Sequence, residues 1–398
     1  MPSSHVLVKP ILPTIVHLDA DAFFVSVEQA LNPALRGKKV AVGGAQRGII
    51  SSASYEARAC GVYTPMPTAQ AVRVCPDLVL VAHSSGRYSE YSQRLFDVCE
   101  SLTPLVERRS IDEGYLDVGP CAFRSAAETE TAVRALQERI WRELQITVSF
   151  GLAANKLIAG IASKLRKPRG FVVVPPGSEA EFLAPLEIGR LPGIGAKTEA
   201  ALKAQGLHNI SDLFARNEDE LRTLFGAGWR GMIATARGED SSVVESVETD
   251  AKSYSQQETF PADIGDLAEI ERVAKHMIDD LMPKIRADGK RVRTLTVKVR
   301  YPGMENESAG QSLEAATDLE APFYPLVRPL LRKAWSRRRP LRLVSVRFSG
   351  VEEGPAQLEM FAEAEEKRRR LASVLDQLNL RAAKPIVQHG HQLGRKRE

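Results

Sequence analysis

The sequence is poor in cysteine and has no long hydrophobic run, and each absence excludes a class of protein. Four cysteines in 398 residues are too few for a disulfide scaffold. No stretch approaches the roughly 18 apolar residues of a membrane span, and the N-terminal residues lack the unbroken apolar stretch of a signal peptide. We therefore expect a cytoplasmic protein that binds no membrane. The spacings between the four cysteines match no CxxC, zinc or short disulfide framework. We therefore expect reduced, structural thiols at Cys60, Cys75, Cys99 and Cys121.

The length and charge of the chain indicate several domains, one of them basic. At roughly 100 to 200 residues per domain, 398 residues predict two to four domains, and the 43% hydrophobic content is enough to form their cores. The net charge is only +4. Residues 252–351, however, hold 18 Lys and Arg against 13 Asp and Glu, whereas residues 1–251 hold 27 against 29. The positive excess lies in one block near the C-terminus, where a polyanionic partner would account for it.

The hydrophobic pattern predicts two units that mix helices and strands. A β-prone run at residues 14–18 and alternating helices and strands over residues 85–175 suggest an α+β sheet domain. Residues 178–240 look helical. From residue 253 to residue 350 the order strand, helix, strand, strand, helix, strand predicts a two-layer unit with a four-stranded sheet. A charged amphipathic helix is expected over residues 364–380.

Three carboxylates stand at predicted turns. Asp19 follows the first strand, and Asp112 and Glu113 are adjacent between two β-prone runs. Like charges gathered in one site repel each other and usually need a cation. Mg²⁺ suits such a site because it takes a few carboxylate oxygens and keeps room for water and phosphate oxygens. The alternative is that Asp19 caps a turn while the other two lie on an exposed hairpin, since acidic turns are common.

A second group of residues suits a triphosphate. Tyr55 and Arg58 stand at the start of a predicted helix that follows Ser52, and Lys167 belongs to a Lys-Pro-Arg-Gly segment. A helix N-terminus, a phenol, a guanidinium and an ammonium can together bind phosphate oxygens. A surface helix with ordinary charges is the alternative.

The segment Leu-Pro-Gly-Ile-Gly-Ala-Lys at residues 191–197 is typical of a helix-hairpin-helix. Gly193 and Gly195 let backbone N–H groups approach a DNA phosphate, and Lys197 adds positive charge. Such contacts position a duplex without reading its sequence. A plain tight turn between two helices is the alternative.

One apolar cluster interrupts the polar C-terminal sequence. Residues 357–361 read Gln-Leu-Glu-Met-Phe. A pentapeptide of this kind can dock in a hydrophobic pocket of a partner through Gln357, Leu358, Met360 and Phe361. The alternative is that it packs on its own domain.

Four sequence blocks in the right order resemble the Y-family of translesion DNA polymerases, closest to its bacterial polymerase IV (DinB) branch. The similarity covers nearly the whole chain. It is highly specific because the four blocks occur in the same order as in the family. The blocks are residues 15–28, residues 54–67, residues 110–117 and residues 149–170. The resemblance implies a template-directed DNA polymerase that adds deoxynucleotides to a primer 3′-hydroxyl, copies with low fidelity and passes damaged template bases.

The resemblance also implies an α+β multidomain chain with a right-hand architecture. Its parts would be a ferredoxin-like palm, small fingers, a helical helix-hairpin-helix thumb and a βαββαβ little finger. The basic little finger would hold duplex phosphates, so its affinity for DNA would depend on salt. The expected bounds are residues 1–19 and 84–175 for the palm, 20–83 for the fingers, 176–243 for the thumb, 244–251 for a linker, 252–351 for the little finger, and 352–398 for a tail with the clamp-binding motif.

Carried over by position, the resemblance gives each candidate residue a role. Asp19, Asp112 and Glu113 would hold two Mg²⁺ ions, with Asp112 and Glu113 as the catalytic pair. The backbone carbonyl of Ala20 would be a further ligand. Phe24 would be a steric gate that excludes the 2′-hydroxyl of a ribonucleotide. The expected triphosphate contacts are Phe23, Ser52, Tyr55, Arg58 and Lys167.

The implied partners are primer-template DNA, deoxynucleoside triphosphates and a sliding clamp (beta), which would bind residues 357–361; a monomer is expected. Asp21 is expected to cap the following helix rather than to bind metal.

Three positions depart from the family pattern, and Met360 is a mild variation on the usual Leu of the clamp motif. Gly114 replaces a small residue with a side chain, Gly160 a frequent Lys, and Tyr63 a common Arg. Tyr63 could alter contacts around the templating base.

Two other functions use parts of the same pattern. A non-catalytic relative could act as a DNA- and clamp-binding adaptor, but such adaptors tend to lose the metal carboxylates that are present here. A nucleotide cyclase also uses paired palm carboxylates, but the helix-hairpin-helix and the little-finger pattern disfavour it. Primer extension with Mg²⁺ separates the three functions.

Overall fold

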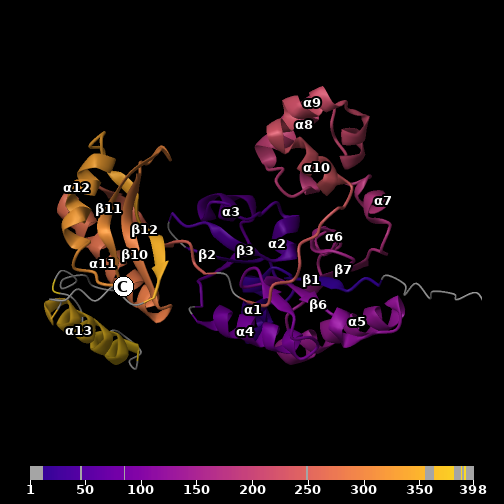
Figure 1. The fold of residues 1–398 in the computed structure, drawn as a ribbon, viewed down its shortest axis with the longest axis horizontal. Coiled ribbons are helices and arrows are strands. Elements are labelled where there is room, and N and C mark those ends of the chain that lie inside the picture. The colour runs from indigo at the N-terminus through magenta and orange to yellow at the C-terminus, as the bar shows by residue number, and fades with distance from the viewer. Residues whose placement is uncertain are drawn as a thin grey trace, which may run out of the picture. The chain divides into compact units, whose positions relative to one another are not determined.

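The protein forms two compact units, Met1–Glu248 and Thr249–Glu398 (Figure 1). The structure is a computed structural model, and it describes residues 12–44, 47–84, 86–247, 250–354 and 363–380, together with Val387 and Gly390. In this part of the chain no helix is long and apolar enough to cross a membrane.

A five-stranded sheet forms the centre of the first unit. The central strand runs antiparallel to both of its neighbours, and the last pair is parallel. All six residues of the central strand are buried, because helices cover both faces of the sheet. In their order across the sheet the strands are β5 (Val106–Arg108), β6 (Glu113–Asp117), β1 (Ile15–Ala20), β7 (Val148–Ala153) and β8 (Phe171–Val173).

Successive side chains of β1 face different layers, as strand geometry requires. Val16 and Leu18 pack in one core with α4 (Arg87–Glu100) and α5 (Ala126–Leu144). Ile15 belongs to another core, which includes α6 (Lys156–Ala162). Figure 1 shows α4 and α5 below the sheet and α6 above it. Asp19 is an even number of residues from Ile15 in the same strand, so its side chain also lies on the α6 side.

A smaller sheet follows β1 in the sequence, reached through α1 (Phe23–Leu31). Its middle strand is antiparallel to one neighbour and parallel to the other. Two short helices share a separate small core with it, namely α2 (Tyr55–Ala59) and α3 (Thr68–Val74). In their order across the sheet the strands are β3 (Ile50–Ala53), β2 (Val40–Gly43) and β4 (Val79–Val81).

Short helices form the last part of the first unit. Leu183, Leu202 and Ile233 share one core with Ile158 of α6, so this helical part packs on the α6 side of the large sheet. The α-helices are α7 (Glu179–Leu183), α8 (Ala196–Ala204), α9 (Glu218–Phe225) and α10 (Trp229–Ala236).

The second unit has the predicted βαββαβ order, and the prediction of a four-stranded sheet is confirmed. Two amphipathic helices, α11 (Leu267–Ala287) and α12 (Tyr324–Ala334), cover one face of the sheet and share its core. The other face stays open. In their order across the sheet the strands are β11 (Asn306–Thr317), β10 (Lys290–Arg300), β12 (Leu341–Glu353) and β9 (Tyr254–Ile264).

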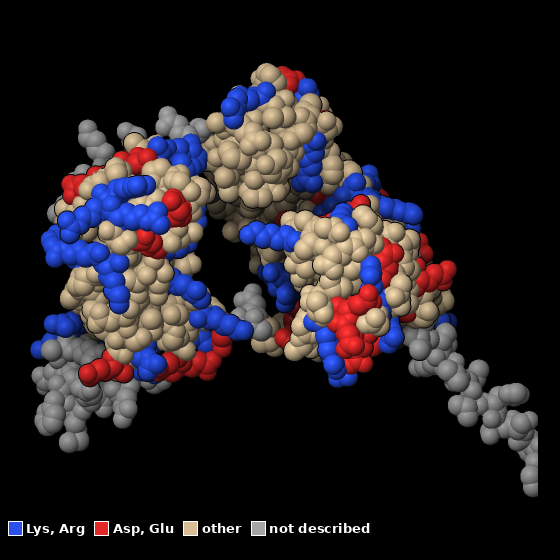
Figure 2. Space-filling model, turned by 90° about the horizontal axis from the view of Figure 1, so that it is seen from above, with Lys and Arg blue, Asp and Glu red and all other residues tan. Residues whose placement is uncertain are grey.

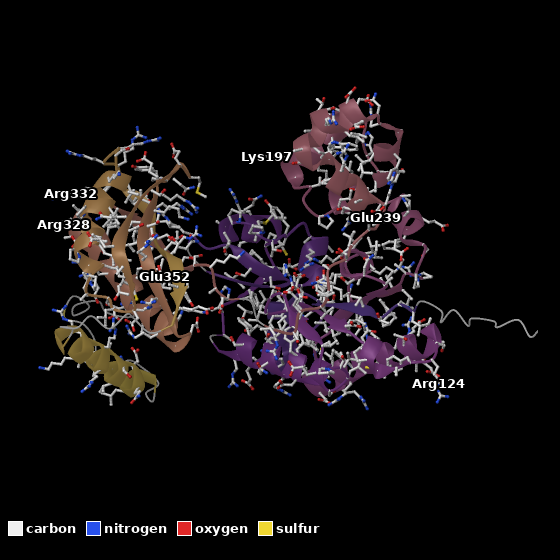
Figure 3. All side chains as sticks on the ribbon, in the orientation of Figure 1. Arg124, Lys197, Glu239, Arg328, Arg332 and Glu352 are labelled. Carbon is white, nitrogen blue, oxygen red and sulfur yellow. The ribbon has the colours of Figure 1, made fainter. Side chains whose placement is uncertain are left out.

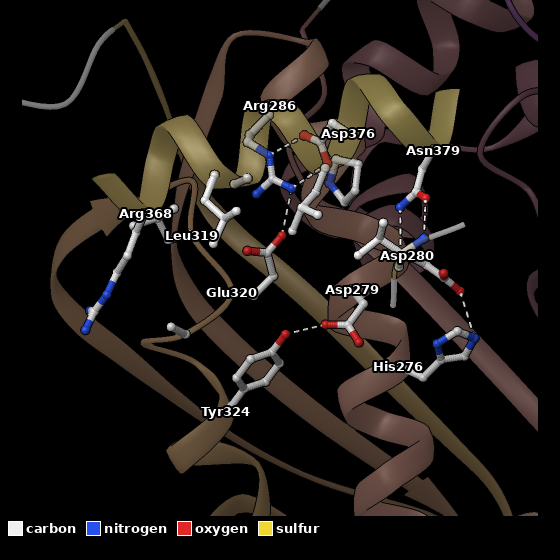
Figure 4. A pocket seen from close by; sticks show the side chains of 16 residues that line it. His276, Asp279, Asp280, Arg286, Leu319, Glu320, Tyr324, Arg368, Asp376 and Asn379 are labelled. Carbon is white, nitrogen blue, oxygen red and sulfur yellow. Dashed lines mark hydrogen bonds and ion pairs between the residues drawn. The ribbon is translucent and has the colours of Figure 1, made fainter. Parts of the chain in front are cut away.

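The predicted C-terminal helix, α13 (Glu363–Leu380), lies against the second unit. The Arg286 guanidinium of α11 pairs with Asp376 of α13 at 2.6 Å and with Glu320 at 2.7 Å (Figure 4). A cavity of about 430 Å³ is enclosed between α13, α11 and the start of α12. The helix is therefore docked on the unit through a cation held by two carboxylates.

Candidate active site

Two of the predicted catalytic carboxylates are direct neighbours in the large sheet. Asp19 and Glu113 are partners in the antiparallel pair of β1 and β6, so their side chains lie on the same face. Asp112 is in the turn before β6, and its backbone carbonyl accepts a hydrogen bond of 2.9 Å from the N–H of Ala20. The fold thus places Asp19 beside residues that lie far along the chain.

Two lysines neutralise these carboxylates. Lys167 pairs with Asp19 and lies 3.8 Å from Oδ1 of Asp21, while the ammonium of Lys164 is 3.2 Å from Oε2 of Glu113. Burial raises the pKa of the Asp19 carboxyl, and the charge of Lys167 opposes this rise. The nearby cation therefore offsets part of the cost of burying this carboxylate.

The chemistry of these groups fits a hard divalent cation. Asp19, Asp112 and Glu113 offer carboxylate oxygens, which Mg²⁺ prefers, and the buried Asp19 gains from any added positive charge. Among the described residues no group of three His, Cys, Asp or Glu side chains is arranged to hold an ion. Asp112 Oδ1 instead accepts a hydrogen bond of 2.6 Å from the Ser110 hydroxyl, and Glu113 is turned to Lys164. Joint coordination therefore requires rotation of the Asp112 and Glu113 side chains.

Asp21 does not cap helix α1, so the predicted N-cap role is wrong. The N-cap is Ala22, which has a left-handed backbone with φ of 45° and no side-chain cap. The buried Asp21 carboxylate instead accepts hydrogen bonds from the Ser149 hydroxyl at 2.8 Å and from the N–H of Arg169 at 2.7 Å. These bonds tie the end of β1 to β7 and to the loop that carries Lys167. The Asp21 carboxylate is therefore engaged by partners far along the chain instead of by the first turn of α1.

The predicted triphosphate residues Tyr55 and Arg58 lie in contact with each other, and Tyr55 reaches Asp21. The Tyr55 hydroxyl donates to Oδ1 of Asp21 at 3.5 Å, and the Arg58 guanidinium lies 4.9 Å from the centroid of the Tyr55 ring. Burial raises the pKa of the Tyr55 hydroxyl, so it stays a donor. Ser52 is buried in β3. Tyr55 and Lys167 thus meet at Asp21, next to the carboxylates, and Arg58 packs on the Tyr55 ring.

The predicted steric gate, Phe24, is held by aromatic neighbours. Its ring centroid lies 4.5 Å from that of Tyr88 and 6.0 Å from that of His83. The Tyr88 hydroxyl donates to Glu28 at 2.6 Å, which fixes this ring in turn. Phe23 differs because its side chain is buried in the core of the large sheet and cannot contact a nucleotide.

Sequence reasoning missed two residues beside the carboxylates, His17 and Lys164. His17 is on the same face of β1 as Asp19, with Nδ1 2.7 Å from the Ser163 hydroxyl and Nε2 4.0 Å from Oε2 of Glu113. Burial, helped by nearby lysines, lowers the pKa of His17 to about 3, so the ring is neutral. The alternation of side chains along a strand could have predicted the position of His17. A histidine two residues before Asp19 in a buried strand has to face the same layer.

The structure gives a physical reason for two glycines that depart from the family pattern. A Cβ on Gly114 would lie 2.7 Å from the Glu107 carbonyl oxygen and 2.8 Å from the ring of Phe96. A Cβ on Gly160 would lie 2.7 Å from the Tyr115 hydroxyl. Large aromatic side chains therefore fill the space that a side chain at either position would need.

The predicted helix-hairpin-helix is on the surface of the first unit. Leu191 and Ile194 are buried, whereas Gly193, Gly195 and Lys197 are exposed around the start of α8. Gly193 has φ of +91°, which strains any residue with a side chain. Figure 3 shows Lys197 at the edge of this helical part. Backbone and ammonium are thus presented together to solvent.

The open face of the second unit's sheet is polar and basic. In cross-strand register Thr296 pairs with Arg347 and Lys298 with Ser345. In Figure 2 Lys and Arg side chains spread over the second unit, with Asp and Glu side chains among them and along its lower edge. Other residues with side chains on the open sheet face include Ser255, Gln257, Thr294, Ser308 and Ser312, none of which carries a negative charge. A polyanion could lie on this surface without meeting a carboxylate at these positions.

The predicted clamp-binding residues Gln357, Leu358, Met360 and Phe361 lie outside the described residues. By sequence they stand between β12 and α13, two elements of the second unit.

Family models match most of the chain. The impB/mucB/samB family matches residues 18–164, the C-terminal domain of that family matches residues 251–360, and the IMS family HHH motif matches residues 176–207. The first match contains the three carboxylates, the third contains the exposed glycine hairpin, and the second covers the basic sheet.

Curated relatives and solved structures resemble the chain over most of its length. It is 68% identical to the DNA polymerase IV of Opitutus terrae over 387 residues, 97% of this chain and 99% of that protein. It is 37% identical to the DNA polymerase IV of Desulfatibacillum aliphaticivorans, over 91% of this chain and 92% of that protein. A Y-family DNA polymerase chimera of Dbh and Dpo4 matches with a TM-score of 0.79 and 27% identity, over 85% of this chain and 99% of the chimera. An insertion ternary complex of Dbh DNA polymerase matches over the same shares with a TM-score of 0.61 and 27% identity.

Proposed function

The chain belongs to the Y-family of DNA polymerases, in its DinB or DNA polymerase IV branch, and from this premise we propose how its own residues carry out the reaction. It is a DNA-directed DNA polymerase of the translesion type. Its substrates are primer-template DNA and deoxynucleoside triphosphates. The observation that carries the proposal is the pairing of Asp19 with Glu113 across β1 and β6, next to Asp112 and two lysines.

The fold is that of a right-hand polymerase. We assign the large sheet with α4 to α6 to the palm and the small sheet with α2 and α3 to the fingers. The helices from α7 to α10 form the thumb, and the βαββαβ unit is the little finger. For these domains we propose the bounds expected from the sequence.

Polymerases of this family depend on divalent metal ions. We propose that two Mg²⁺ ions are held by the carboxylates of Asp19, Asp112 and Glu113, together with the backbone carbonyl of Ala20. Ions bound there would activate the primer 3′-hydroxyl and neutralise the leaving pyrophosphate. Lys164 and Lys167 support this site because their ammonium groups balance the charges of Glu113 and Asp19 before any ion binds.

The triphosphate is bound by cations and donors that face Asp21. Lys167 lies between Asp19 and Asp21, and Arg58 rests on the Tyr55 ring, so both positive charges can turn toward a polyanion with small movements. The Tyr55 hydroxyl adds a neutral donor. Ser52 and the backbone at Phe23 would complete the contacts.

Phe24 selects the sugar by size. Its ring is fixed by Tyr88 and His83, so it cannot move away from a 2′-hydroxyl without disturbing two neighbours. A deoxynucleotide has no group at this position. Discrimination therefore needs no hydrogen bond to the sugar.

Two surfaces hold the DNA duplex without reading its sequence. Gly193, Gly195 and Lys197 of the thumb would bind backbone phosphates through N–H groups and one ammonium. The open sheet face of the little finger would bind phosphates through side chains such as Lys298 and Arg347. We further propose that residues 357–361 dock on a sliding clamp and that the enzyme acts as a monomer in the cytoplasm, with low fidelity.

Primer extension with Mg²⁺ tests the proposal. The double variant Asp112→Ala, Glu113→Ala should lose extension while it still binds primer-template DNA, because the open sheet face is unchanged. Glu130→Gln, on the exposed surface of α5, is the matched control and should extend normally. Extension by the double variant at the wild-type rate would remove these residues from the site. Binding without extension by the wild-type protein would identify an adaptor instead.

A further inference from the structure

Cys60 and Cys75, which belong to no sequence motif, lie in the same small core of the small sheet domain, where Cys75 is buried and Cys60 packs against it. Cys60 follows α2 and Cys75 follows α3, each at the C-cap position. The two thiols are neighbours, since burial, the hydrogen bond to Asp77 and Cys60 together raise the pKa of Cys75. The neighbouring residues meet as well, since a Cβ on Gly61 would lie 3.3 Å from Cγ1 of Val74. The ends of both helices are therefore packed side by side.

Charged groups surround this thiol pair. The ammonium of Lys39 lies 2.8 Å from Oδ2 of Asp77, and Asp77 and then Cys60 raise the pKa of Lys39. The thiol of Cys75 donates to Oδ1 of Asp77 at 3.5 Å. Cys60 is partly exposed and Cys75 is buried, with 1% of its surface accessible. Partly exposed thiols in electropositive surroundings are the ones that oxidants reach, so Cys60 is the first target and Cys75 the second.

The other two cysteines differ from this pair. Cys99 is fully buried in α4, and Cys121 donates to the backbone carbonyl of Leu102 at 3.3 Å. Both belong to the core of the large sheet rather than to the small core of Cys60 and Cys75. They provide internal controls within the same chain.

We propose that Cys60 and Cys75 form a reversible disulfide when the protein meets hydrogen peroxide. The Cys60 thiolate attacks one peroxide oxygen, the O–O bond breaks, and the leaving hydroxide takes up a proton to become water. Cys60 is then a sulfenic acid. The Cys75 sulfur attacks the Cys60 sulfur, an S–S bond forms, and the S–O bond breaks.

The proton of Cys75 passes through Asp77, which already accepts its hydrogen bond, to the departing hydroxide. Two thiols and one peroxide thus give one disulfide and two waters, and the two thiols supply both electrons. Burial raises the pKa of the Cys75 thiol to about 11, which is consistent with a group that stays protonated until the sulfenic acid forms beside it. A dithiol reductant restores both thiols by exchange.

The bridge would act on nucleotide binding, a step that rests on the proposed function. Cys60 follows Arg58 on the same short helix, and the guanidinium of Arg58 is oriented by its bond to the Ala53 carbonyl at 3.0 Å. A bond between the two sulfurs is about 2.05 Å long, so it pulls the end of α2 toward α3. We expect the KM for the incoming nucleotide to rise at least about threefold, with a smaller change in kcat.

Mass spectrometry of the full-length protein tests the bridge directly. Hydrogen peroxide should remove two hydrogens and yield a Cys60–Cys75 linked peptide that a dithiol reductant separates. Cys60→Ser and Cys75→Ser should each abolish the linked peptide, while Cys121→Ser, the control, should leave it unchanged. Asp77→Asn should slow its formation. Two results would overturn the proposal. One is oxidation of Cys60 without a link to Cys75, and the other is no oxidation of Cys60 at peroxide concentrations below those that overoxidise Cys99.

Steady-state kinetics then test the consequence separately. Peroxide should raise the nucleotide KM of the wild-type enzyme, and Cys60→Ser should be insensitive. A linked peptide with unchanged KM would retain the disulfide but refute its effect on Arg58. No extension by the untreated enzyme would instead refute the proposed function, and the mass measurement would still stand.

Discussion

The two β-sheets of this protein handle charge in opposite ways. In the palm, helices cover both faces of the sheet, and the buried Asp19 has its own partner in Lys167. In the little finger, helices cover one face, and Lys298 and Arg347 project from the other among neutral side chains. A closed sheet can place single groups for chemistry because neighbours fix each one. An open sheet offers summed charge to a long polyanion, so no single residue decides the outcome.

The largest effect should come from the closed sheet. Asp19→Asn keeps the size of the side chain but removes the charge that pairs with Lys167 and that we propose to bind the metal ions. We expect kcat to fall by at least about 10³-fold, measured by single-turnover primer extension. Binding of DNA should change less than about twofold, because the open sheet is untouched. A similar fall in DNA affinity would mean that the two sheets do not divide the work.

Sugar selection should show a smaller but still local effect. Phe24→Val removes the ring that Tyr88 and His83 hold in place. The ratio of kcat/KM for deoxynucleotides over ribonucleotides should fall on the order of 100-fold. Tyr88→Phe keeps the ring and loses only its hydroxyl, so this control should retain most of the discrimination. Equal ratios for Phe24→Val and the wild type would remove Phe24 as the gate.

A glycine-to-alanine change should also lower the free energy of unfolding by different amounts in the two sheets. Gly114→Ala in the closed sheet puts a methyl group against the Glu107 backbone and the Phe96 ring, which should destabilise the palm by about 1–3 kcal/mol. Gly310→Ala in the open sheet meets chiefly the Thr296 hydroxyl, a side chain that can turn away. Chemical denaturation should therefore show a clear loss for the first variant and little for the second. The reverse order would contradict the packing described for Gly114.

The smallest effects should come from single charges of the open sheet. Lys298→Ala and Arg347→Ala should each weaken DNA binding only a few-fold and lower the slope of log affinity against log salt by about 1. Arg139→Ala, on the surface of α5, serves as the control. The rate of nucleotide addition at saturating DNA should stay unchanged. A slope equal to that of the wild type would place the duplex elsewhere.

How far the sequence predicted each region follows from the kind of signal that each carries. The βαββαβ order could be read because its amphipathic periods repeat over long elements, as in α11 and β10. Asp19 and Glu113 were predicted through resemblance to a family, since spacing alone left an acidic turn equally open. Their cross-strand pairing is a tertiary fact that sequence distance does not encode.

The misses have the same origin. Asp21 was expected to cap α1 because a polar residue before a helix usually does, but its bonds to Ser149 and Arg169 come from segments far along the chain. The shared core position of Cys60 and Cys75 was missed for a related reason: it depends on how α2 and α3 pack, and the spacing of the two cysteines in sequence matched no known framework. Local rules fail where long-range partners compete with local ones.

One paired measurement tests the division of work most directly, namely DNA affinity and single-turnover extension on the same preparations of two variants. Asp112→Ala, Glu113→Ala should keep wild-type DNA affinity and lose extension. Lys298→Ala, Arg347→Ala should lose DNA affinity and extend at the wild-type rate once DNA is saturating. If both variants lost both properties together, or if the carboxylate variant extended primers normally, the account given for the two sheets would be contradicted.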